Sequence, residues 1–240
     1  MTAPVPPAPQ PVSATDPLRD VVAVMDRLYS PGGCPWDREQ THESLVRYLL
    51  EEAHELADAI ETGDRAGMRE ELGDLLLQVL FHARIASEEP DPFTVDDVAA
   101  DLAAKLVRRH PHVFADADAT DLHEQWDAIK KAEKQRTSVL EGISHTQGAL
   151  ARTQKVLSRA GRGGLGDVVG TALAAPSGGA PAAVGDEGTT ADERLGRELL
   201  ALVARAEEDG LDAEAALRGE LRRVEGEIVA AETRRAEGTA

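Results

Sequence analysis

The chain has 240 residues, 42% hydrophobic and 29% charged, which is enough to bury a core in one or two domains. It contains no apolar run long enough to span a membrane and does not begin like a signal peptide, so membrane insertion and secretion are disfavoured. Its 44 acidic and 26 basic residues give a net charge of −18, which disfavours binding to nucleic-acid polymers. The single cysteine, Cys34, excludes a disulfide framework within the chain and is typical of a cytoplasmic protein.

Composition divides the chain into four segments. Residues 1–17 hold six of the thirteen prolines and almost no charge, which predicts a disordered tail. Residues 18–160 contain all seven aromatic residues, so we expect the main helical domain there. Residues 161–191 contain nine glycines and are predicted to be a Gly/Ala-rich linker, and residues 192–240 return to a helical pattern.

Apolar residues recur with helical spacing throughout, without the alternation that marks strands, so the predicted fold class is all-α, a helical bundle. The expected helices are 18–30, 43–62, 65–88, 94–109, 121–136 and 147–160. Thr62, Gly63 and Asp64 join the second helix to the third. A connection this short predicts an antiparallel pair of helices.

Four acidic residues lie on the apolar faces of this predicted pair. Glu52 and Glu55 share the face of the first helix that carries Leu45, Leu49 and Leu56, and Glu71 and Asp74 border the stripe of the second that carries Leu75. Glu51 lies about 100° from Glu52 around the helix and is predicted to be peripheral.

Carboxylates in such positions are costly unless they are paired or bind a cation. An all-oxygen donor set favours Mg²⁺, with Mn²⁺ as the other suitable ion, over zinc. In the alternative reading, these acids edge a solvated face and pair with arginines.

A basic cluster follows on the predicted helix 94–109. Lys105, Arg108 and Arg109 lie on one face, just before His110, Pro111 and His112 end the helix. Taken alone, they could be the solvated end of a helix, where cations complement the dipole. Together with a divalent metal they suggest a clamp for a polyphosphate.

Three separated motifs resemble the MazG family of all-α nucleoside triphosphate pyrophosphohydrolases. They are Gly33-Cys34-Pro35-Trp36-Asp37, the pair Glu51-Glu52-Ala53-His54-Glu55 with Glu71-Leu72-Gly73-Asp74, and the run from Lys105 to Phe114 that includes Arg-Arg-His-Pro-His. The resemblance extends from about residue 18 to residue 160. It implies an Mg²⁺-dependent enzyme, usually a homodimer, that converts nucleoside triphosphates to monophosphates and pyrophosphate.

The resemblance also implies roles for individual residues. Metal ligation falls to Glu52, Glu55, Glu71 and Asp74, and triphosphate contacts fall to Lys105, Arg108 and Arg109. Trp126 is implied in nucleotide binding, although a tryptophan serves equally well as a hydrophobic anchor. The expected chemistry is attack on the α-phosphorus by a water that the metal site activates, with Glu51 or Glu55 as candidate bases.

A second, degenerate copy of the motif region is suggested near the end of the chain. Residues 193–206 match residues 70–83 at six of fourteen positions, but Glu71 and Asp74 correspond to Arg194 and Arg197. Such a copy cannot hold a metal in the same way, and chance similarity between leucine-rich helices is the alternative. We therefore place activity in the first copy.

The predicted function is the hydrolysis of canonical or damaged nucleoside triphosphates in the cytoplasm. One alternative is a helical module that binds nucleotides or proteins without turnover. A closer rival is a narrower enzyme for a single nucleotide, such as deoxyuridine or deoxycytidine triphosphate.

Overall fold

A computed structural model describes residues 16–115, 137–174 and 190–238. Over these ranges the chain forms helices and no strands, which confirms the all-α prediction. The helices fall into two compact units, residues 1–126 and 127–240. The predicted helix 121–136, with Trp126, and most of the predicted tail lie outside the described residues.

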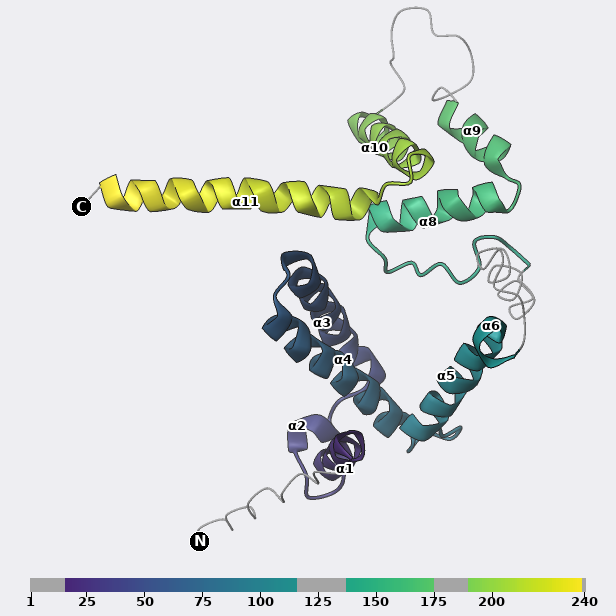
Figure 1. The fold of residues 1–240 in the computed structure, drawn as a ribbon, viewed down its shortest axis with the longest axis vertical. Helices are drawn as coiled ribbons and strands as arrows, with labels where there is room; N and C mark the ends of the chain where they lie inside the picture. Colours follow the sequence, from purple (N-terminus) through teal and green to yellow (C-terminus); the bar gives the residue numbers. More distant parts are fainter. Residues whose placement is uncertain (1–15, 116–136, 175–189, 239–240) are drawn as a thin grey trace, which may run out of the picture. The chain divides into compact units, whose positions relative to one another are not determined.

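The first unit is built around two long antiparallel helices, α3 and α4 (Figure 1). Its elements are α1 (Pro17–Tyr29), α2 (Pro35–Arg38), α3 (His42–Thr62), α4 (Arg65–Ala86), α5 (Val95–Arg109) and α6 (Pro111–Phe114). The four longer helices lie within two residues of their predicted bounds. The sequence pattern missed α2 and α6 because four residues are too few to show a helical period.

Local sequence explains why the α3–α4 hairpin forms. Thr41 and Ser44 form a capping box at the start of α3. Gly63 ends α3 with a φ of 73°, a left-handed conformation that favours glycine. The Asp64 carboxylate then accepts hydrogen bonds from the backbone N–H groups of Ala66 and Gly67 and begins α4.

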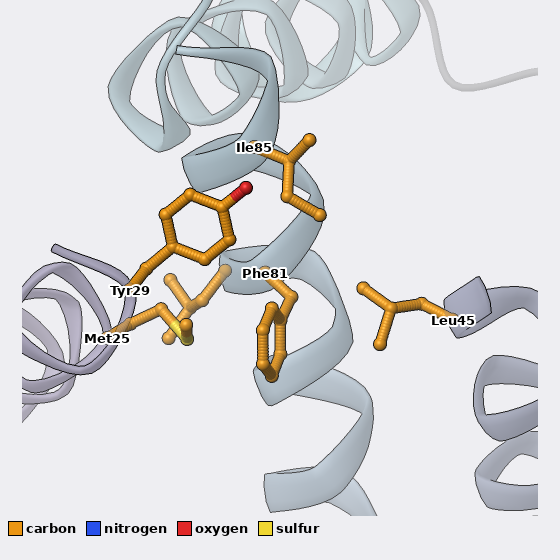
Figure 2. Packing of buried hydrophobic residues seen from close by; sticks show 6 residues of the cluster. Met25, Tyr29, Leu45, Phe81 and Ile85 are labelled. Atoms are coloured by element: carbon orange, nitrogen blue, oxygen red, sulfur yellow. The ribbon is translucent and has the colours of Figure 1, made fainter. Parts of the chain in front are cut away.

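The core of this unit lies at the carboxyl-terminal half of α4. Figure 2 shows Phe81 between α1 and α3, with Tyr29 and Ile85 close by. The buried cluster consists of Met25, Tyr29, Leu45, Leu80, Phe81 and Ile85. Around its edge the Arg84 guanidinium donates to Asp26 at 2.7 Å and to Glu88 at 2.9 Å, which ties α4 to α1. The amino-terminal half of α4 is therefore left to carry polar residues.

The second unit contains α8 (Ala149–Arg162), α9 (Gly166–Ala174), α10 (Ala191–Glu208) and α11 (Ala213–Gly238). Helix α8 contacts the other three. Glu214 of α11 accepts a hydrogen bond from the Ala151 N–H in the first turn of α8. One turn further along α8, the Gln154 side chain donates to the Leu211 carbonyl and accepts from the Ala213 N–H, which fixes the α10–α11 turn.

This arrangement differs from the predicted domain division. Helix α8 was expected to belong to the catalytic domain of residues 18–160 but packs within the second unit, because periodicity shows that a helix has an apolar face without showing which partner covers it. The first two residues of the predicted linker 161–191 belong to α8, and the linker also contains α9. In α9 the apolar residues Val168, Val169 and Leu173 favour a helix despite the neighbouring glycines.

Candidate active site

Three carboxylates meet between the long helices of the first unit. One oxygen from each of Glu52 and Glu55 on α3 and Glu71 on α4 lies within 4.8 Å of the others. Glu52 and Glu71 are half-buried, while Glu55 is exposed. Among the residues that the structure describes, this is the one group of three or more acidic, histidine or cysteine side chains with such spacing.

The electrostatics of the cluster reflect crowding of negative charge. Partial burial raises the pKa of Glu52, and the charges of Asp74, Glu55 and Glu71 raise this pKa further. Partial burial also raises the pKa of Glu71, with contributions from Glu55, Asp74 and Glu70. A side-chain hydrogen bond between Glu52 and Glu71 also raises the pKa of Glu52 and lowers that of Glu71.

The remaining two acidic candidates lie at the margin of this cluster. Asp74 is half-buried and close enough to raise the pKa of both Glu52 and Glu71, but its oxygens are not within the 4.8 Å group. Glu51 is exposed and lies outside the group, as its position around the helix predicts. The structure thus brings together three of the four predicted ligands and leaves Asp74 beside them.

The residues present fit a hard divalent cation. Several acidic groups of like charge converge within a few ångströms, and such a set is stabilised when a cation binds between them. The donors are all carboxylate oxygens, which Mg²⁺, Mn²⁺ and Ca²⁺ prefer to softer nitrogen or sulfur ligands.

The basic cluster of α5 lies apart from the carboxylates within one chain. Helix α5 contacts α4, and Val95 at its amino-terminal end packs against the core cluster. In Figure 1, α5 then runs away from the α3–α4 hairpin. Lys105, Arg108 and Arg109 lie near its far end, whereas Glu71 belongs to the first half of α4.

Two further side chains near the carboxylates were not selected as site residues from the sequence. Trp36 is 49% exposed and makes edge contacts with Tyr48, one turn before Glu52, and with Phe81. Gln78, one turn after Asp74, is 4% exposed, and its Oε1 has no hydrogen-bond partner among the described residues. The sequence could have indicated Gln78 by its position on an apolar helix face, and Trp36 by its position in a turn.

Fold and site together define a class of protein: an all-α protein whose central helix pair presents a carboxylate cluster suited to a divalent cation. Residues 40–114, which span this pair and α5, match the family model described as the MazG nucleotide pyrophosphohydrolase domain. The chain belongs to the MazG family. The family predicted from the motifs is thereby confirmed.

Several known proteins resemble the chain over much of its length. It is 47% identical over 206 residues to a Streptomyces cacaoi protein named "Uncharacterized 26.1 kDa protein in blaB 3'region", covering 84% of this chain and 76% of that one. It is 53% identical over 151 residues to the nucleoside triphosphate pyrophosphohydrolase of Mycobacterium tuberculosis, covering 62% of this chain and 46% of the relative.

A third relative is the Thermotoga maritima nucleoside triphosphate pyrophosphohydrolase/pyrophosphatase MazG, 45% identical over 150 residues. The match covers 62% of this chain and 58% of the relative. The chain thus spans about half the length of the two relatives whose names give an activity. Within the described parts of the chain, none of the helices is both long and apolar enough to cross a membrane.

Proposed function

We propose that this protein hydrolyses nucleoside triphosphates, or their deoxy forms, to the monophosphate and pyrophosphate with Mg²⁺ as cofactor. The carboxylate cluster of Glu52, Glu55 and Glu71 is the observation that carries this proposal. It lies within the region that matches the MazG domain, and relatives with that domain are named for this activity. The nucleotide pool of the cytoplasm is the expected place of action.

Glu52, Glu55 and Glu71 would hold the metal, with Asp74 completing the set from the edge of the cluster. When bound, a divalent ion supplies neutralisation of phosphate charge and makes a nearby water a better nucleophile. Glu55 is exposed, so its carboxylate is available to accept a proton from the attacking water, with the exposed Glu51 as the other candidate base. Attack at the α-phosphorus would release pyrophosphate.

The nucleobase would be held on the side of the hairpin where Trp36 meets Tyr48. Half of the Trp36 surface is exposed, and an exposed aromatic ring offers a stacking surface for a base. The unpartnered Gln78 oxygen lies on the same helix as the acidic residues and is suited to accept a hydrogen bond from a ligand or a water.

The cations that contact the triphosphate would come from a second copy of the chain. The far end of α5 carries three cations suited to phosphate binding, Lys105, Arg108 and Arg109. This end of the helix lies apart from the α3–α4 hairpin of the same chain (Figure 1). The positive charge of the three cations complements the carboxylate cluster, and α5 also exposes Val98, Leu102 and Leu106 along one side, an apolar stripe that a partner could cover. We therefore propose a homodimer in which each site combines acids of one chain with cations of the other.

Product analysis tests the activity. Purified protein is incubated with each of the eight common nucleoside triphosphates, with and without Mg²⁺, alongside Glu71→Gln. We expect metal-dependent formation of monophosphate and pyrophosphate that is lost in the folded variant. Diphosphate with orthophosphate would refute attack at the α-phosphorus, and no turnover of any substrate would favour a damaged nucleotide or a binding function.

Mixing Glu71→Gln, which should be inactive, with Lys105→Gln, which should be impaired at substrate concentrations below KM, tests the shared site. In a heterodimer of Glu71→Gln and Lys105→Gln chains, one of the two sites combines an intact acidic set with an intact Lys105. Random exchange of subunits should therefore restore about a quarter of wild-type turnover. If acids and cations act within one chain, the mixture shows no more turnover than the average of its two components.

A further inference from the structure

Helix α11 carries an exposed apolar stripe with the spacing of a coiled coil. Its apolar residues recur at intervals of four, three, four and three, at Leu217, Leu221, Val224, Ile228 and Ala231. The first four are between 38% and 58% exposed. Figure 1 shows most of this 26-residue helix projecting beyond the other helices of its unit.

The contact between α11 and α8 leaves this stripe uncovered. The contact includes the Ala213 N–H, which donates to Gln154 of α8, and Glu214, which accepts from the Ala151 N–H and lies 3.6 Å from Arg218. Around the helix, Glu214 lies about 60° and Arg218 about 100° from the centre of the stripe, and Glu214 precedes Leu221 by one heptad. The hydrogen bonds to α8 lie in the first turn of α11, so a helix packed along the stripe from Leu221 to Ala231 would not displace α8.

From this geometry we infer that α11 pairs with α11 of a second copy of the chain in an antiparallel coiled coil centred near Gly226. In this register Val224 lies opposite Ile228 of the partner subunit, and Leu221 lies opposite Ala231 of the partner subunit. The stripe of each chain is then covered by the stripe of the other.

The charges beside the stripe select this orientation. In a parallel pair in register, the flanking contacts would place Glu220 against Glu225 of the partner subunit and Glu227 against Glu232 of the partner subunit, all like charges. In the antiparallel pair, Arg218 faces Glu232 of the partner subunit, and Glu220 faces Arg234 of the partner subunit. Each of these two attractive contacts occurs twice because of the two-fold symmetry.

Charge also selects the register within the antiparallel orientation. Two like-charge contacts remain at the centre, between the two copies of Glu225 and between the two copies of Glu227. Arg223 weakens the repulsion between the two copies of Glu227, because its guanidinium donates to both Glu220 and Glu227 of its own helix. A shift by one heptad in either direction reduces the four attractive contacts to two and still leaves two repulsive ones.

Site-directed cross-linking of the full chain tests the pairing. In a Cys34→Ser background, the double variant Leu221→Cys/Ala231→Cys places each new thiol opposite its counterpart on the partner. The single variant Leu221→Cys is the matched control, because its two thiols would be separated by about 15 Å along an antiparallel pair and would face each other in a parallel one. A short bis-maleimide reagent and mild oxidation are both applied.

We expect a cross-linked dimer from the double variant and monomer from the single variant. Arg218→Glu in the double-cysteine protein should lower the yield, and adding Glu232→Arg should restore it, because the exchange recreates the unlike pair. A dimer from the single variant would overturn the antiparallel orientation. Monomer from both variants would overturn the pairing and indicate that another part of the same chain covers the apolar stripe. Turnover does not enter these readouts, so the pairing and the proposed activity fail independently.

Discussion

Replacing Glu52 with glutamine should stabilise the metal-free protein while removing its response to Mg²⁺. The change keeps the size of the side chain and deletes one charge from a cluster whose oxygens lie within 4.8 Å. Two carboxylates at that separation repel by about 1 kcal/mol in a water-like dielectric, and Glu52 faces two. After a discount for exposure and salt screening we expect a net gain of about 1 kcal/mol.

The pH dependence gives this prediction its sign. The pKa of Glu52 is raised in the folded protein, so the folded state holds its proton more tightly than the unfolded chain does. Wild-type stability therefore falls as the pH rises through the raised pKa and the cluster becomes fully charged. The advantage of Glu52→Gln should be absent near pH 4 and complete at pH 7.5.

Thermal unfolding in chelator and in Mg²⁺ measures both effects. In chelator at pH 7.5, we expect Glu52→Gln to unfold about 4 to 8 °C above the wild type. Added Mg²⁺ should raise the midpoint of the wild type and leave that of the variant unchanged. Glu51→Gln is the matched control, because Glu51 is exposed and lies outside the cluster. A lower midpoint for Glu52→Gln than for the wild type in chelator, or an Mg²⁺-induced rise of the variant's midpoint as large as that of the wild type, would refute the reasoning.

Four other changes probe the core and the site. Leu45→Ala, at a side chain 1% exposed, should cost about 3 kcal/mol in denaturant unfolding, and a loss below about 1 kcal/mol would contradict its place in the core. Gln78→Leu should raise stability by about 1 kcal/mol and raise KM, since Oε1 lacks a partner; a stability loss would show that the oxygen has one.

The pKa of His82 is lowered by burial and by His42. The free energy of unfolding should therefore fall as the pH drops below about 6.5, the usual pKa of histidine. His82→Gln should abolish that fall, as measured by thermal unfolding at pH 5 and pH 7.5. Lys105→Gln should raise KM for triphosphates at least about tenfold, because one charged phosphate contact is lost, and should leave the melting midpoint unchanged. An unchanged KM would show that Lys105 does not belong to the site.

The sequence by itself determined the helices of the first unit and the identity of the acidic candidates. Helical periodicity and strong caps, such as Thr41 and Asp64, are local signals, so α3 and α4 were predictable within two residues. The short turn at Gly63 also required the two helices to be antiparallel, which brings Glu52 and Glu71 face to face.

Only the tertiary structure decided which candidate residues lie together in the site. Helical angle places Asp74 on the same face as Glu71, but the packing of α3 against α4 leaves its oxygens outside the closest group. The direction of α5 is likewise set by contacts at the end of α4, so the spacing of Lys105, Arg108 and Arg109 could not reveal their separation from the acids.

The packing of the second unit was equally hidden from the sequence. An apolar helix face can be buried by any partner with a complementary surface, and pattern alone does not choose among them. The structure joins α8 to α11 through Glu214 and Gln154, contacts between residues about 60 positions apart. Local signals thus fixed the helices, whereas long-range packing decided which of them share a unit and which side chains share a site.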